Sequence, residues 1–289
     1  MLTAASLAGG ASILAIAPRV QVLPHPVAPR VDVTIDATPF ASYSYLTAMP
    51  RPALVALHAA SGAPITRDGQ SSDSHSQLGF WLAHGNVNGI DFVEAERLVH
   101  RRVVEAQSSD TRGRLAVQTA WTAADGSTVV LEDTSFTFAG TDRERIVDRV
   151  TRLAAVNGPV RLGATTRALV GLQLAAGFDE RAAVSDAGRD RGSPCVDGPG
   201  RWIAIPGALA GQRVMVALFD HPGNAGLPSI VRCRADRLEL VPSGDTHIDA
   251  GASMTLRYRV IIFDGRATAV EVERRFHEFG GRPRRGTDR

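Results

Sequence analysis

Residues 115–138 decide the fold class: they read Leu115-Ala-Val-Gln-Thr-Ala-Trp121, then Asp125-Gly126, then Thr128-Val-Val-Leu-Glu-Asp-Thr-Ser-Phe-Thr-Phe138. An Asp-Gly pair between two such runs is a strong hairpin signal, because glycine tolerates the positive φ that a tight turn requires. Strands joined by a tight turn run antiparallel. The segment therefore predicts an antiparallel pair near the middle of the chain.

Strand patterns extend from this hairpin over most of the sequence. Val31, Val33 and Ile35 alternate with polar residues, which is the period-two pattern of a half-buried strand. Further strands are expected at residues 98–106, 146–154, 214–219, 238–241 and 256–263. The fold class is therefore predicted to be all-β.

One helical pattern is convincing. Ala269, Val272, Phe276 and Phe279 recur at helical spacing within residues 267–279, and Gly280-Gly281 supplies a stop. We predict a large antiparallel β-sandwich with this one C-terminal helix, forming a single domain over residues 20–281 and followed by a disordered tail at 282–289. Residues 73–94 are expected to form a long loop over the sandwich.

The composition is that of a globular protein, with 44% hydrophobic and 21% charged residues. All 32 basic residues are arginine; they are scattered and nearly matched by 30 acidic residues, so the net charge of +2 gives no case for binding nucleic acid. The run of Arg143, Arg145, Arg149 and Arg152 alternates with acidic residues and indicates a strand face with ion pairs. The two cysteines, Cys195 and Cys233, permit either one disulfide or two free thiols.

Residues 1–19 are apolar and small, and carry no charge before Arg19. They resemble a truncated export signal with a small-x-small site at Ala15-Ile16-Ala17, although a positively charged beginning is missing. We expect export to the periplasm or the exterior, with a cytoplasmic protein as the alternative if Met1 is the true and uncleaved start. No other segment reaches the ~18 apolar residues of a membrane span.

Residues 73–94 also carry side chains that suit a functional site. Imidazole and carboxylate groups ligate metals or move protons near neutral pH. The candidates for metal or acid–base chemistry, which include two residues outside this segment, are Asp73, His75, His84, Asp91, His100 and His221. No metal is specified by their spacing, and a divalent cation stays one possibility. For each histidine the alternative is an ordinary loop imidazole.

Three further residues are candidates for ligand contact. Trp81 could offer its face to the apolar side of a pyranose, or else belong to the core. Asn88 precedes Gly89 in a turn, and Asn224 ends the Asp220-His-Pro-Gly-Asn motif, which has the composition of a turn but could also line a pocket.

The ordered series of motifs resembles the bacterial PmoA-type family, whose members bear the label "methane oxygenase PmoA" and are of largely unknown function. The motifs that carry the resemblance are residues 73–94, 31–36, 145–149, 220–224 and 256–260. Several positions that are histidine in that family are Ser74, Ser76 and Gln77 in this chain. The resemblance implies a sandwich fold, and the departures imply a divergent or inactive member.

Two functions of different class follow. The chain is either a non-catalytic sandwich that binds a carbohydrate-like ligand in a pocket under the 73–100 loop, or an enzyme acting on a glycoside or sugar derivative. His75, His100, Asp73 and Asp91 would be the catalytic residues of the enzyme. His84, Trp81, Asn88, His221 and Asn224 would contact the ligand in either case. The carbohydrate class rests on analogy of fold.

Overall fold

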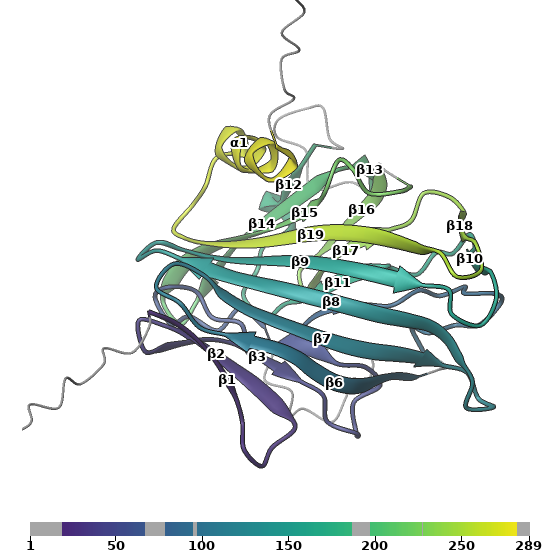
Figure 1. Ribbon diagram of the computed structural model, residues 1–289. Helices are drawn as coiled ribbons and strands as arrows, with labels where there is room; N and C mark the ends of the chain where they lie inside the picture. The colour runs from purple at the N-terminus through teal and green to yellow at the C-terminus, as the bar shows by residue number, and fades with distance from the viewer. Residues whose placement is uncertain (1–18, 67–78, 95–96, 187–196, 227, 282–289) are drawn as a thin grey trace, which may run out of the picture.

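The computed structural model describes residues 19–66, 79–94, 97–186, 197–226 and 228–281. Within them the chain forms two large antiparallel sheets that face each other, with one α-helix near the C-terminus (Figure 1). Strands account for 55% of the described residues and helices for 6%. The predicted antiparallel β-sandwich with a C-terminal helix is confirmed.

The nine-stranded sheet has the spatial order β1 (Val20–Pro24), β2 (Arg30–Ile35), β3 (Thr38–Ser44), β4 (Ala53–Val55), β5 (Phe80–Leu82), β11 (Val170–Gln173), β17 (Arg237–Val241), β16 (Ser229–Arg234) and β13 (Gly198–Gly200). The eight-stranded sheet has the order β12 (Val184–Ser185), β14 (Trp202–Leu209), β15 (Gln212–Asp220), β19 (Ser253–Asp264), β9 (Glu144–Ala154), β8 (Thr128–Gly140), β7 (Gly113–Thr122) and β6 (Arg97–Gln107). Two short strands pair separately, β10 (Val160–Leu162) with β18 (Thr246–Ile248), and the 3-10 turn η1 (Glu180–Ala182) precedes β12.

The predicted hairpin is β7 and β8, which pair antiparallel from Gly113 opposite Phe138 to Thr122 opposite Thr128. Gly126 has a φ of 85°, and the Asp125 carboxylate accepts a hydrogen bond of 2.9 Å from the Ser127 backbone N–H. The Asp-Gly pair therefore forms the tight turn that the sequence predicted.

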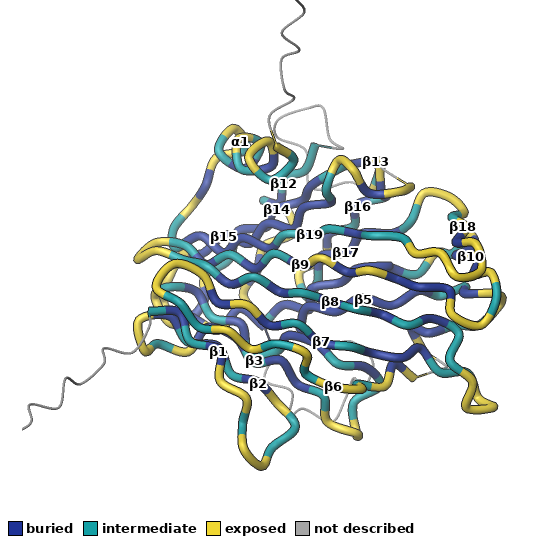
Figure 2. Tube along the Cα trace, viewed as in Figure 1, coloured by how far each residue is buried: buried dark blue, intermediate teal, exposed yellow. Residues whose placement is uncertain are grey.

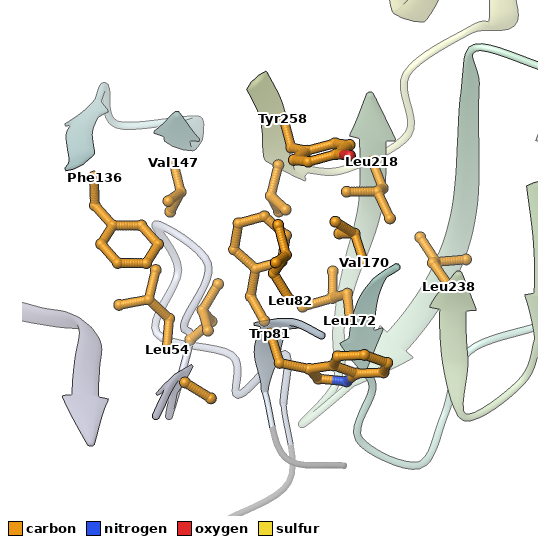
Figure 3. Packing of buried hydrophobic residues seen from close by; sticks show 14 of the residues in the cluster. Leu54, Trp81, Leu82, Phe136, Val147, Val170, Leu172, Leu218, Leu238 and Tyr258 are labelled. Atoms are coloured by element: carbon orange, nitrogen blue, oxygen red, sulfur yellow. The ribbon is translucent and has the colours of Figure 1, made fainter. Parts of the chain in front are cut away.

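The main core lies between the two sheets, where buried strand segments cross the middle of the molecule (Figure 2). The inner faces of both sheets supply this core, and Figure 3 labels Leu54, Leu82, Phe136, Val147, Val170, Leu172, Leu218, Leu238 and Tyr258 within it. No helix among the described residues is long and apolar enough to cross a membrane.

Helix α1 (Ala269–Gly280) forms a second core on the outer face of the eight-stranded sheet. Thr268 caps it by accepting a hydrogen bond from the Glu271 N–H, and Val272 and Phe276 are its buried residues. Strands β14 and β15 are consequently covered on both faces. Most of their residues are buried, and the alternation that would have identified β14 from sequence is absent.

Strand β5 corrects the expectation of a loop at residues 73–94, because Phe80–Leu82 lies in the centre of the nine-stranded sheet. Trp81 is 1% exposed and pairs with Gly171 of β11. A Cβ atom on Gly171 would lie 2.4 Å from the Trp81 indole, and the Arg51 guanidinium covers the ring at 4.8 Å from its centroid. Glycine is required there because the indole lies against the backbone.

We expect Gly171→Ala to lower the free energy of unfolding by about 1–3 kcal/mol, because the new methyl group would displace a buried indole. The matched control is Gly244→Ala, where a Cβ atom meets nothing within 4 Å; that change should have a small or slightly stabilising effect. Urea denaturation of both variants measures the difference. Equal midpoints would contradict the packing argument.

Candidate functional site

A pocket of about 500 Å³ opens where the start of β6 meets the connection between β3 and β4. Most of its walls are apolar, and Tyr45, Thr47, Arg97 and His100 supply the polar atoms. The complete lining is Pro29, Tyr45, Leu46, Thr47, Met49, Pro52, Arg97, Leu98, Val99 and His100. We call it the Tyr45–His100 pocket. Ligand sites of small molecules have volumes of about 300–1,000 Å³ and this mixture of walls.

His100 is held between two tyrosines. Its ring stacks on Tyr45, with centroids 4.0 Å apart and planes 26° apart. Its Nδ1 atom is 3.2 Å from the hydroxyl of Tyr43, which is 2% exposed. Burial lowers the pKa of His100 below its ordinary value, so the imidazole is neutral at pH 7.

Backbone geometry fixes these positions. The pairing of β6 with β7 shifts register between His100 and Arg102, and such a bulge re-aims neighbouring side chains. The Tyr45 N–H donates to the Pro29 carbonyl at 3.0 Å, and the Arg97 guanidinium donates to the Thr47 carbonyl. The pocket is therefore tied together across three segments of the chain.

A buried ion pair lies behind the pocket. Arg149 and Glu132 are 5% and 4% exposed, and Nη2 of Arg149 is 2.7 Å from Oε1 of Glu132. The Trp121 indole and the Thr134 hydroxyl also donate to Glu132, and Nε of Arg149 donates to Thr151. The sequence indicated a strand face with ion pairs here, and Arg149 does form one, but β9 turns this side chain into the core so that the pair is buried.

The predicted site residues do not all meet. Asp73 and His75 lie outside the described residues. His100 lines the Tyr45–His100 pocket, whereas His221 follows β15 and packs edge-on against Phe279 of α1, with centroids 5.0 Å apart. Four strands separate β6 from β15 in the sheet, which corresponds to on the order of 20 Å. His100 and His221 therefore belong to different places.

Three predicted residues have local structural contacts. Asp91 accepts hydrogen bonds from the Val93 and Glu94 backbone N–H groups, and lies 3.8 Å from the Arg167 guanidinium. Asn88 bridges to the Pro159 carbonyl and the Arg161 N–H. Trp81 is buried beneath Arg51, so its ring offers no open face.

His84 and Asp220, the first residue of the 220–224 motif, line the same small cavity of about 20 Å³. Nδ1 of His84 accepts from the Asn86 N–H, and its buried Nε2 has no hydrogen-bond partner among the described residues. Asp220 accepts from Asn224 and Ser229, both at 2.6 Å. Burial lowers the pKa of His84 to about 4 and raises the pKa of Asp220 to about 6.

No three His, Cys, Asp or Glu side chains gather closely enough to hold a metal ion within the part of the chain that the structure describes. A metal site that includes Asp73 and His75 stays a prediction, because both fall outside that part. Cys195 also lies outside it, and its pairing with Cys233 stays open.

Sequence reasoning missed Tyr43, Tyr45 and Arg97 as pocket residues. A signal was present, since the chain has only three tyrosines and two of them stand two residues apart. That spacing puts both on one face of a strand. The partner strand that carries His100 could not be identified from this pattern.

Residues 30–277 match the family described as "Family of unknown function (DUF6807)". The chain belongs to this family. The resemblance to a PmoA-type family was wrong as an assignment, because the matching family is DUF6807 and no match to a PmoA family is found. No protein of curated function matches this DUF6807 chain.

Several solved structures are similar to this chain at very low sequence identity and with TM-scores below 0.5. Slr1438 from Synechocystis sp. PCC 6803 is 10% identical, with a TM-score of 0.39 over 89% of this chain and 100% of that one. A galactose mutarotase-like protein from Lactobacillus casei ATCC 334 is 9% identical, with a TM-score of 0.38 over 84% and 99%. The galactosidase domain of AgaSK is 7% identical, with a TM-score of 0.45 over 84% of this chain and 42% of that one. At these scores no activity is transferred to the DUF6807 chain.

The buried pair His84 and Asp220 predicts two opposing effects of pH on stability. Asp220 has a higher pKa in the folded state than its ordinary 3.8, so its contribution is lost as pH rises through about 6. His84 has a lower pKa in the folded state than its ordinary 6.5, so its contribution is lost as pH falls through about 4. Each shift corresponds to on the order of 3 kcal/mol.

Relative to the wild type, Asp220→Asn should therefore gain stability as pH rises from 4 to 6, and His84→Asn should gain as pH falls over the same range. Urea denaturation of the three proteins at several pH values measures this. If the two variants shift in the same direction, one of the two assignments fails.

Proposed function

We propose that this DUF6807 chain binds a carbohydrate-like ligand in the Tyr45–His100 pocket and does so without catalysis. The observation that carries the proposal is the stacked Tyr45–His100 pair on the wall of an apolar pocket of about 500 Å³. A pyranose has an apolar C–H face and a rim of hydroxyl groups. An aromatic side chain suits the face, while neighbouring polar groups suit the rim.

The pocket offers both kinds of contact. Tyr45, Leu46 and Val99 provide apolar surface, and the last two are 49% and 40% exposed. Exposed apolar side chains beside a hollow are typical of a binding site. His100, Thr47 and Arg97 provide hydrogen-bonding groups beside that surface.

The lining favours binding over glycoside hydrolysis. Glycosidases of the usual kind place two carboxyl groups on either side of the scissile bond. The described residues that line the pocket include no Asp or Glu. His100 is the one imidazole among them, and its Nδ1 already contacts Tyr43.

The alternative is an acid–base or metal-dependent enzyme acting on a glycoside or sugar derivative. Neutral His100 would be its proton carrier, and Asp73 and His75 would have to supply further groups. Export of the chain stays a prediction as well, because residues 1–18 lie outside the described part of the structure.

A screen of soluble saccharides, followed by titration calorimetry on any hit, tests the proposal. Tyr45→Ala and His100→Ala should each weaken binding about tenfold or more, because each removes one ring of the stack. The control is His277→Ala on α1, a residue whose side chain is 65% exposed and which is not part of the pocket lining. Binding that survives both pocket substitutions, or no saccharide binding by the wild type, would refute the proposal.

A further inference from the structure

Two side chains of β6, Arg97 and His100, offer hydrogen-bond donors to the Tyr45–His100 pocket. Arg97 and His100 both begin β6, and both line the pocket. Arg97 donates to the Thr47 carbonyl, but none of the described carboxylates pairs with it. A guanidinium has five N–H donors, so most of them stay available to a ligand.

Tyr43 determines which ring nitrogen of His100 carries the proton that a ligand can accept. The Thr119 hydroxyl hydrogen-bonds to the Tyr43 phenol, and burial together with the Glu132 carboxylate raises the pKa of Tyr43 well above its ordinary value. Tyr43 therefore keeps its proton. The Tyr43 hydroxyl and Nδ1 of His100 are 3.2 Å apart. Because an imidazole nitrogen is more basic than a phenol oxygen, we expect the Tyr43 hydroxyl to be the donor of this hydrogen bond. The proton of the neutral ring is then on Nε2, and no described residue accepts from it.

Buried side chains behind the pocket fix the position of Tyr43. A cavity of about 10 Å³ is lined by Tyr43, Thr119, Glu132 and Arg149 among others, and it shares Pro52 and Leu98 with the wall of the pocket. The buried ion pair thus lies directly behind the pocket. Its hydrogen-bonded side chains form a rigid support, since breaking a buried pair is costly.

We propose that the Tyr45–His100 pocket selects an acidic saccharide of the uronate class, whose carboxylate accepts hydrogen bonds from Arg97 and from Nε2–H of His100, with Tyr43 as the positioning residue. A guanidinium pairs with a carboxylate through two parallel hydrogen bonds, which a neutral hydroxyl cannot match. An amino sugar would bring a positive charge to Arg97 with no described carboxylate in the lining. The inference rests on the saccharide-binding function proposed above.

The ligand test compares glucuronate, glucose and glucosamine oligosaccharides of equal length on the full chain. The uronate should bind about tenfold more tightly than the neutral sugar, and added salt should weaken its binding more. Arg97→Gln should weaken binding of the uronate more than binding of the neutral sugar, and so remove this preference. Arg102→Gln, which removes the same charge from the same strand outside the pocket lining, should leave the preference intact.

The outcomes separate the two proposals. Equal or tighter binding of the neutral sugar overturns the uronate assignment and leaves saccharide binding standing. If none of the three oligosaccharides binds, both fail.

The role of Tyr43 has a readout that requires no ligand. In ¹⁵N-histidine NMR of the wild type, Nε2 of His100 should carry the proton. Tyr43→Phe removes a donor to Nδ1 and should raise the pKa of His100, whereas Tyr45→Phe keeps that donor and should not. A proton on Nδ1 in the wild type, or a lower His100 pKa in Tyr43→Phe, would overturn the assignment. The wild-type spectrum decides the matter even if Tyr43→Phe fails to fold.

Discussion

The continuity of the nine-stranded sheet depends on the three residues of β5. Strand β5 pairs with β4 through Leu54 and Phe80 alone, and with β11 through three residue pairs. The second of these pairs brings the Trp81 indole onto the backbone of Gly171. One face of β5 therefore enters the core between the sheets, and the other is closed by an indole and the Arg51 guanidinium. Leu82 and Trp81 point to opposite sides of β5 in Figure 3.

Two groups of polar side chains are buried among the apolar residues of the sandwich, and they differ in how many of their hydrogen-bonding atoms have partners. Glu132 and Arg149 neutralise each other and bind to surrounding hydroxyl and indole groups, so their charges are compensated. His84 and Asp220 face one small cavity, and burial shifts their pKa values in opposite directions. The first group supports the pocket. The second group brings the 220–224 turn and the segment after β5 to the same cavity.

The candidate pocket lies at the edge of the sandwich and not beneath the centre of the 73–94 segment. At that edge, the β3–β4 connection of one sheet meets the start of β6 from the other. The side chains of the β3–β4 connection and those of β6 are far apart in sequence. The register shift after His100 re-aims its ring, which stacks on Tyr45. His100 therefore lines the pocket, whereas its predicted partner His221 lies beside α1, on the far side of four intervening strands.

The sequence by itself determined the fold class, the β7–β8 hairpin and the terminal helix, because these depend on local signals: an Asp-Gly turn, period-two alternation and a helical apolar stripe. It also singled out His84, His100 and the 220–224 motif. It could not identify β14, which is covered on both faces by the sandwich and by α1, or β5, which has only three residues. Only the tertiary structure turned Arg149 inward, joined His84 to Asp220, and placed Tyr43 and Tyr45 against His100. Those contacts depend on strand order and register, which are set by pairings between residues that are distant in the chain.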